Sequence, residues 1–311
     1  MRISTSTGDF SGYARGVCDK VRLFRGSKFK YINLEQSSCE VYFAEGDEYK
    51  KYAEELALAR GFAGVEYVIS HAPCLNAFEE LTEEHYAKTL RAIERAIEIC
   101  GILGIRDIVV HASTNPAFSK EDFFRENKRF YTDLFPTMER YGVRVMIENM
   151  HDVPFYTFST GAEMREFLDE VAHPLLGACF DTAHCNLNER ARELGQYKNI
   201  LDIGDKLFGL HISDNLGGTN HHHSWPFAGI INFDEVIQGL IDVGFDGYFN
   251  FEASYTLLHS TNPPKYRRPW VRGEETARRL QNPSYELKFK AVDLLYDIGK
   301  YMLDAYGIFE E

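Results

Sequence analysis

The sequence predicts an α/β protein that forms a single (β/α)8 barrel, or TIM barrel, over residues 1–311. Three observations predict it: β-rich runs alternate with amphipathic helical stretches, eight such units follow one another, and no obvious linker interrupts them. Strands that alternate with helices pair in parallel, and eight of them can close into a barrel. A doubly wound open sheet is the alternative, which the number of strands disfavours.

Each predicted strand is a short run rich in β-branched and aromatic residues. The runs cover residues 2–7, 31–36, 65–73, 105–113, 143–150, 175–184, 207–215 and 247–254. Helical periodicity lies between and after them, with apolar stripes through Tyr86, Leu90, Ile93, Ile97 and Cys100, through Phe233, Val236, Ile237, Leu240 and Ile241, and through Leu287, Ala291, Leu294 and Ile298. Four glycines are predicted to separate helices from the next strands: Gly101, Gly104, Gly142 and Gly244.

Composition limits the class of protein and its partners. The chain has 34 basic and 47 acidic residues, a formal net charge of −13, so it lacks the basic footprint typical of nucleic-acid binding and favours a small-molecule partner. No run approaches the roughly 18 apolar residues of a membrane span, and the first residues lack a signal-peptide pattern. The six cysteines have no CxxC spacing, which indicates buried thiols in a reducing compartment. We therefore expect a cytoplasmic protein without a membrane segment, which could assemble as a homo-oligomer.

From the third strand onward, each predicted strand is apolar until its last residues and then carries a side chain of metal-ligand type. These side chains are His71, His111, Glu148, Asp181 with His184, His211 with Asp214, and Glu252. In a barrel such ends meet at the C-terminal face, where barrel enzymes have their active sites. A carboxylate within an apolar strand is costly unless it is paired or metal-bound. Three carboxylates and an imidazole around one centre suit Mn²⁺, Zn²⁺, Fe²⁺ or Co²⁺.

Four short motifs carry a resemblance to a known family. They are IEN at 147–149, FDTAH at 180–184, HISD at 211–214 and NFE at 250–252. In this order and strand placement they resemble the xylose isomerase-like superfamily of barrels. That superfamily includes sugar-phosphate isomerases and epimerases, ketohexose 3-epimerases, inositol-catabolism enzymes and apurinic endonucleases of the deoxyribonuclease IV type. The resemblance covers nearly the whole barrel and is more specific for the superfamily than for one activity.

The isomerase and epimerase branch implies one divalent metal held by Glu148, Asp181, His211 and Glu252, with Zn²⁺ or Mn²⁺ favoured. The metal would bind adjacent oxygens of a keto sugar, and Glu148 and Glu252 would transfer a proton through a metal-stabilised enediolate. His184 would contact substrate hydroxyls. The resemblance therefore implies a metal-dependent isomerase or epimerase of a sugar or sugar phosphate.

Metal ligands usually need hydrogen-bonded neighbours to orient them. Asn149 and Asp214, next to predicted ligands, are the candidates for this task. Other chemistry on the same ligand set, or binding of a sugar without catalysis, is a further alternative because fold and ligands do not determine the reaction.

The endonuclease branch implies a multi-zinc phosphodiesterase with two or three metals instead. Its additional histidines match His71, His111 and His184. After the seventh strand the chain has three consecutive histidines. We prefer the register that aligns His223 and His221 with a D-x-H pair, which leaves His222 pointing away. A shift by one residue would instead select Asn220 and His222. The missing aspartate, the net charge, and Cys74 in place of a common aromatic wedge disfavour this branch.

The loop at 262–280 contains the strongest local basic cluster: Lys265, Arg267, Arg268 and Arg272. Loops after barrel strands cross the active face, so this one could clamp a substrate phosphate or carboxylate. We favour a solvated or subunit-contact segment, because three prolines stiffen it.

Overall fold

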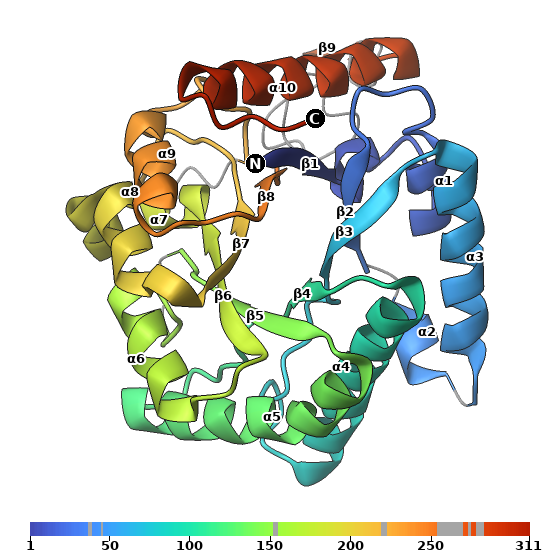
Figure 1. Cartoon of the computed structure of the whole chain (residues 1–311). Coiled ribbons are helices and arrows are strands. Elements are labelled where there is room, and N and C mark those ends of the chain that lie inside the picture. Colours follow the sequence, from blue (N-terminus) through green and yellow to red (C-terminus); the bar gives the residue numbers. More distant parts are fainter. Residues whose placement is uncertain are drawn as a thin grey trace.

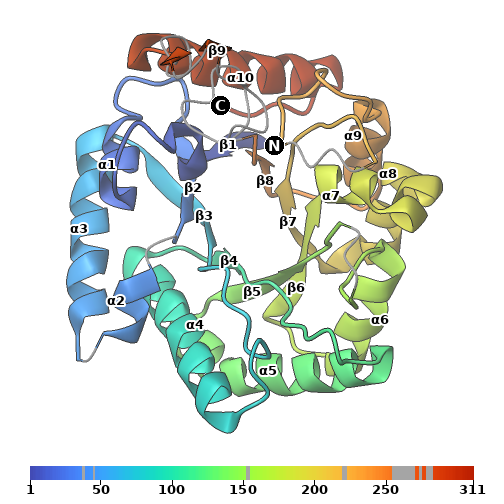
Figure 2. The ribbon, with the colours of Figure 1, turned by 180° about the vertical axis from the view of Figure 1, so that it is seen from behind.

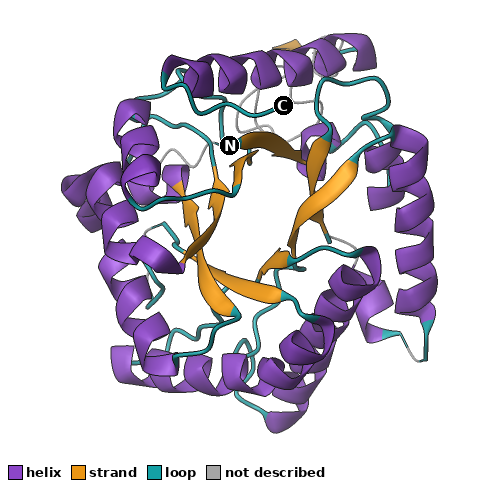
Figure 3. Cartoon of the chain, viewed as in Figure 1, coloured by secondary structure: helices purple, strands orange, loops and turns teal. Residues whose placement is uncertain are grey.

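The computed structural model describes residues 1–36, 39–44, 46–151, 155–218, 223–253, 270–272, 275–277 and 283–311. Within these residues, strands form an inner ring and helices surround it (Figures 1 and 3). The inner sheet has eight strands in the order β7-β6-β5-β4-β3-β2-β1-β8. The predicted (β/α)8 barrel is therefore confirmed, while its extent over residues 1–311 as one domain stays a prediction.

The barrel strands are short, and every ladder between neighbours is parallel. They are β1 (Arg2–Ser6), β2 (Tyr31–Glu35), β3 (Glu66–His71), β4 (Asp107–Val109), β5 (Arg144–Glu148), β6 (Leu176–Asp181), β7 (Leu207–His211) and β8 (Tyr248–Phe251). Between β7 and β8 the ring closes through a parallel bridge of Ile212 with Phe251. Because the strands are parallel, all of them end at the same rim.

Helices cover the outside of the ring, as the view from behind also shows (Figure 2). They are α1 (Val17–Arg22), α2 (Cys39–Phe43), α3 (Glu48–Ala63), α4 (Glu83–Leu103), α5 (Lys120–Tyr141), α6 (Gly161–Val171), α7 (Thr182–Leu187), α8 (Glu189–Ile203), α9 (Phe233–Asp242) and α10 (Tyr285–Ala305). Two short 3-10 segments are η1 (Thr7–Phe10) and η2 (Gly204–Lys206). An antiparallel pair, β9 (Trp270–Arg272) and β10 (Glu275–Ala277), lies between β8 and α10 along the chain.

Three of the four predicted glycines follow the ends of helices. Gly104, Gly142 and Gly244 have φ of 74°, 64° and 68°, the left-handed conformation that glycine adopts without strain. The prediction for Gly101 is wrong, because this residue lies inside α4. A Cβ at Gly101 would overlap the ring of Tyr141 at the end of α5, so the glycine permits a close helix–helix contact.

The inside of the barrel has an apolar layer below a polar one. Ile69, Val109, Met146 and Cys179 form a buried cluster separate from the main core. Two residues further along the same strands come His71, His111, Glu148 and Asp181. Side chains two residues apart lie on the same face of a strand, so the apolar cluster lies directly beneath the predicted ligands.

The predicted apolar stripe of the last helix is wrong in register. On α10, Leu287 and Leu294 are exposed, whereas Lys288 is only 1% exposed. The buried face instead follows Lys288, Ala291, Val292, Leu295, Gly299, Met302 and Leu303. Because one member of this face is a lysine, the spacing of apolar residues in the sequence does not identify it. The charge of Lys288 acts on the buried carboxyl of Asp9 on η1.

Among the residues that the structure describes, no helix has both the length and the apolar character needed to cross a membrane.

Candidate active site

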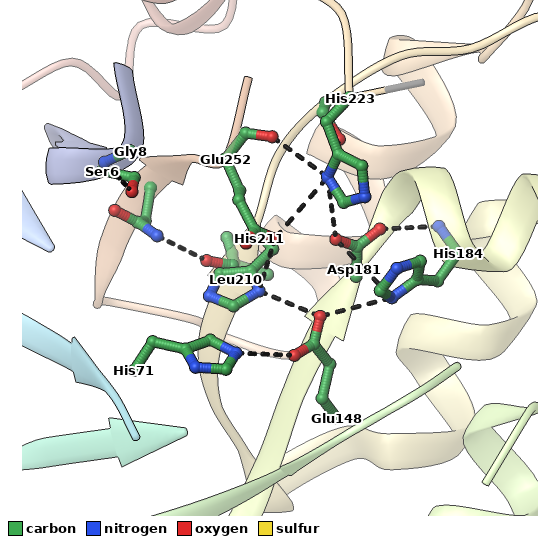
Figure 4. Close-up of polar contacts among 12 residues, drawn as sticks. Ser6, Gly8, His71, Glu148, Asp181, His184, Leu210, His211, His223 and Glu252 are labelled. Carbon is green, nitrogen blue, oxygen red and sulfur yellow. Dashed lines mark hydrogen bonds and ion pairs between the residues drawn. The ribbon is translucent and has the colours of Figure 1, made fainter. Parts of the chain in front are cut away.

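Seven neighbouring strands each bring one ligand-type side chain to the C-terminal rim. They are Glu35 on β2, His71 on β3, His111 just after β4, Glu148 on β5, Asp181 on β6, His211 on β7 and Glu252 just after β8. Many of these side chains converge in Figure 4. A pocket of about 520 Å³ opens here, and Glu148 and Glu252 line it together with several histidines. Asp181 and His211 are fully buried.

The four predicted ligands of one metal lie together. One ligand atom each from Glu148, Asp181, His211 and Glu252 falls within 4.8 Å of the others. His211 Nδ1 lies 3.0 Å from Glu148 Oε1 and 3.1 Å from Glu252 Oε2. The sequence therefore predicted which side chains meet, and the roles assigned to them stay predictions.

Asp181 is held by its position at the start of a helix. Its Oδ1 accepts a 2.6 Å hydrogen bond from the backbone N–H of His184, and so caps α7. Its Oδ2 is buried without a hydrogen-bond partner among the described residues. A buried carboxylate oxygen without a donor is costly, so this atom marks where a cation would be stabilised.

Asn149 holds the end of β6 in place. Its Nδ2 donates to the Asp181 carbonyl at 2.9 Å, and its Oδ1 accepts from the Asp181 backbone N–H at 2.7 Å. Its own carbonyl accepts a 3.0 Å hydrogen bond from His184 Nδ1. These contacts hold the backbone of Asp181 in place, and the task of orienting a metal ligand stays a prediction for Asn149.

Asp214 has different partners from those expected of a residue that orients ligands. Its carboxylate accepts hydrogen bonds from the backbone N–H groups of Asn215, Gly229 and Ile231, at 2.8, 2.8 and 3.1 Å. Its backbone pairs with Ser224 in an antiparallel bridge. Asp214 thus holds the ends of the loop that brings in His223.

The histidines predicted for a second metal or for substrate form two pairs. His71 and His111 approach with their Nε2 atoms 3.1 Å apart, and His111 Nε2 is 3.0 Å from Glu148 Oε2. His184 and His223 lie near Asp181, again within 4.8 Å of one another.

His223 is buried and its Nδ1 donates to the Glu252 carbonyl at 3.2 Å. Figure 4 shows its ring turned toward Asp181 and Glu252. The prediction that this histidine reaches the site agrees with the structure. His221 and His222 lie outside the described residues, as do the side chains of Lys265, Arg267, Arg268 and Arg272.

The electrostatics of the cluster keep two carboxylates ionised. Burial by itself raises the pKa of Glu148, but the charge of His211 and hydrogen bonds from neighbouring histidines lower that pKa well below its usual range. The pKa of Glu252 is also lowered, since the charge and hydrogen bond of His211 outweigh burial. For Asp181 burial dominates and raises the pKa, although His184 and His223 oppose it. Of the three carboxylates, Asp181 is therefore the one whose negative charge the surrounding protein groups stabilise least.

The residues present fit a divalent cation. Three carboxylates and an imidazole are the donors that Mn²⁺, Zn²⁺, Fe²⁺ and Co²⁺ accept. Asp181 Oδ2, which has no hydrogen-bond partner in the described part of the chain, belongs to that set. In the protein alone, positive charge comes from histidines: burial lowers the pKa of His184, but the charge of Asp181 and the hydrogen bond to Glu148 raise it to about 9.

Sequence inspection missed one wall of the pocket. Glu35 lines it at the end of β2, opposite His71 in the β2–β3 register. Ser6 Oγ donates to Glu35 Oε1, and the Glu35 backbone N–H donates to Thr7 Oγ1 at 3.0 Å. A Cβ at Gly8 would overlap this carboxylate, so glycine makes room for it. The run YINLEQ has the same polar ending as the later strands, and extending that pattern to the second strand would have found Glu35.

Comparison with known proteins places this geometry in a family. The family model described as xylose isomerase-like TIM barrel matches residues 21–271. An inosose isomerase of Bacillus velezensis is 25% identical over 182 residues, which cover 56% of this chain and 63% of that protein. A ketose 3-epimerase of Arthrobacter globiformis is 28% identical over 138 residues, or 43% of this chain and 44% of that protein. The chain thus spans less than two thirds of the length of each relative.

A solved structure extends the likeness over nearly the whole chain. The crystal structure of a D-tagatose 3-epimerase-like protein superposes with a TM-score of 0.70 at 20% identity, covering 98% of both chains. At this identity the likeness concerns the fold. Together with the family match over most of the sequence, it establishes that the chain belongs to the xylose isomerase-like TIM barrel family.

Proposed function

We propose that this protein is a metal-dependent isomerase or epimerase of a small carbohydrate, with Glu148 and Glu252 as its proton-transferring groups. One observation carries the proposal: carboxylates from β5 and from the end of β8 contact the same atom, His211 Nδ1, at 3.0 and 3.1 Å, and both line the pocket. A substrate in the pocket would therefore meet both carboxylates.

Glu148, Asp181, His211 and Glu252 would hold the cation, since their ligand atoms are close and Asp181 Oδ2 has no hydrogen-bond donor among the residues that the structure describes. Bound there, a divalent cation would polarise a substrate carbonyl and stabilise the negative charge that develops on its oxygen.

The two glutamates supply the base and the acid. A carboxylate must be ionised to accept a proton from carbon, and the lowered pKa values of Glu148 and Glu252 keep them ionised at neutral pH. In an epimerase the ionised glutamate on one side removes the proton, and the other glutamate must itself carry a proton, taken up from solvent through the open pocket, before it can return one to the opposite face. In an isomerase a proton moves between neighbouring carbons of the substrate.

The surrounding residues suit a polyhydroxylated ligand. His184 and His223 are oriented by Nδ1 donation to the carbonyls of Asn149 and Glu252. Glu35 offers a carboxylate to hydroxyl groups at another wall of the pocket. The volume of about 520 Å³ lies within the range of small-molecule sites.

The named relatives support a carbohydrate substrate. The family match and the likeness to an inosose isomerase and a ketose 3-epimerase favour isomerase chemistry over the phosphodiesterase alternative. We extend the proposal to keto sugars and inososes, with or without phosphate.

The test is turnover of a panel of ketoses, ketose phosphates and inososes in D₂O, with Mn²⁺, Co²⁺ or Zn²⁺ supplied. We expect the wild-type protein to interconvert at least one substrate and to incorporate deuterium at the reacting carbon. Glu148→Gln and Glu252→Gln should each lower kcat by about 10²–10⁴-fold, the usual contribution of a positioned acid or base.

A matched control is Glu98→Gln, which changes another buried glutamate, on α4, outside the pocket. This variant should retain wild-type turnover. Metal binding by the wild-type protein without turnover or deuterium exchange on any member of the panel would refute the proposal.

A further inference from the structure

Glu35 is a carboxylate of the pocket that lies apart from the four-residue set of Glu148, Asp181, His211 and Glu252. It ends β2, and in the closed ring of strands β2 lies across from β6, which carries Asp181. Glu35 is half-buried and lines the same pocket as Glu148 and Glu252. A substrate whose carbonyl is held at the four-residue set would therefore reach toward Glu35 with its far end.

The turn after β1 is built around the carboxylate of Glu35. The buried hydroxyl of Ser6 donates to Glu35 Oε1 and accepts the Gly8 N–H at 2.8 Å. The backbone N–H of Glu35 donates to the buried Thr7 Oγ1 at 3.0 Å, and a Cβ at Gly8 would overlap the carboxylate. Three consecutive residues thus fix Glu35 before any ligand binds, which lowers the entropic cost of using it for recognition.

The carboxylate of Glu35 retains the capacity to accept hydrogen bonds from a ligand. Oε1 accepts from Ser6, whereas Oε2 has no hydrogen-bond donor in the described part of the chain. The neighbouring Gln36 is engaged with the protein instead, because its Nε2 donates to Ser70 Oγ at 2.9 Å and its Oε1 accepts from the Tyr42 hydroxyl at 2.8 Å. On this wall Glu35 is therefore the acceptor for substrate hydroxyls.

The charge of Glu35 has no cationic partner in the pocket wall. Among the described residues that line the pocket, none is a lysine or an arginine. The neutral lining residues other than histidine are Gln36, Ala72, Pro73, Cys74 and Met150, of which Cys74 is exposed, unlike the buried thiols that the cysteine spacing predicts. A phosphate next to Glu35 would meet a like charge, whereas a hydroxyl would donate a charge-assisted hydrogen bond to it.

We propose that Glu35 is a specificity-determining residue, which accepts a hydrogen bond from the terminal hydroxyl of an unphosphorylated sugar and rejects a phosphate at that position. This inference rests on the proposed function, because it takes the carbonyl end of the substrate to lie at the four-residue set. It narrows the substrates to sugars whose far end is neutral.

Binding of three sugars to the Mn²⁺-loaded protein, measured by calorimetry, tests the proposal. They are D-fructose, 6-deoxy-D-fructose, which lacks the terminal hydroxyl, and D-fructose 6-phosphate. Each is compared between the wild type and Glu35→Gln, which keeps the shape of the side chain and removes its charge.

We expect Glu35→Gln to bind D-fructose about 10–100-fold more weakly, since a hydrogen bond to a charged group is lost. It should bind 6-deoxy-D-fructose as the wild type does, because this sugar has no terminal hydroxyl to lose. It should bind D-fructose 6-phosphate at least about 10-fold more tightly, because a like charge is removed. Its affinity for Mn²⁺ should stay that of the wild type, which shows that the variant is folded.

Glu66→Gln is the matched control. Glu66 begins β3 and is exposed at the opposite rim of the barrel, so this variant loses the same charge and should bind all three sugars as the wild type does. Equal losses for D-fructose and 6-deoxy-D-fructose in Glu35→Gln, or unchanged binding of the 6-phosphate, would overturn this inference alone. Failure of the wild type to bind D-fructose would also overturn it, while turnover of another member of the substrate panel would leave the proposed function standing.

Discussion

Replacing Asn149 by alanine removes the clamp on the end of β6 without removing any predicted ligand. Two buried hydrogen bonds to Asp181 are lost, of 2.9 and 2.7 Å, and the backbone N–H and C=O of Asp181 lose these partners. At about 1–2 kcal/mol for each bond, the free energy of unfolding of the metal-free protein should fall by about 2–4 kcal/mol.

The same substitution should weaken metal binding. Asp181 remains, but its carboxylate is no longer held where Glu148, His211 and Glu252 converge. Loss of such an orienting partner typically lowers metal affinity about 10–100-fold, which corresponds to about 1.4–2.7 kcal/mol of binding free energy. Competition against a chelating indicator measures the affinity, and urea unfolding in the presence of a chelator measures the stability.

Asn127→Ala is the matched control. Asn127, on α5, is also fully buried and clamps Ser113 in the same way, accepting from its N–H at 2.9 Å and donating to its carbonyl at 2.8 Å. It should lose comparable stability while keeping the affinity of the four-residue set. If Asn149→Ala loses stability but binds metal as tightly as Asn127→Ala, then Asn149 does not orient Asp181 for a cation.

Three further predictions concern the pocket, pH and metal. Gly8→Ala forces a methyl group against Glu35, so we expect a loss of stability of about 1–3 kcal/mol and a higher KM for the sugar. Gly16→Ala, with nothing within 4 Å of the new methyl group, should leave KM unchanged. Burial raises the pKa of Asp9 from 3.8 to about 6, so ionisation of Asp9 weakens the fold as pH rises through this window. Relative to wild type, Asp9→Asn should gain about 2.4 kcal/mol of unfolding free energy between pH 4 and pH 7 in paired urea unfolding curves, and a constant difference would contradict this. Adding Mn²⁺ at 100 times its Kd should stabilise the metal-free protein by about 2.7 kcal/mol, seen as a rise in Tm; an unchanged Tm would mean that the folded state does not bind the ion.

The sequence by itself determined the fold class and the main polar layer of the site. Strand pairing is set by repeated local patterns, and the penalty for burying a charge makes Glu148 in MIENM or Glu252 in FNFEAS visible without a structure. Because strand residues alternate between two faces, a polar side chain at the end of an inward-facing row must meet its counterparts at one rim. Glu35 obeys the same rule.

Tertiary structure decided what depends on partners far away along the chain. The buried face of α10 includes Lys288, and the charge of Lys288 acts on the carboxyl of Asp9. These two residues are 279 positions apart along the chain, so the spacing of apolar residues within the helix cannot predict their interaction. His223 reaches the site because the carboxylate of Asp214 accepts hydrogen bonds from the backbone of Gly229 and Ile231 and so holds the loop that contains His223. Cys74 lies near His71 and His111 because Asn76 links its loop to the loop that follows β4. Loops have no periodicity to reveal where they point, so only their long-range hydrogen bonds determine which of their side chains reach the pocket.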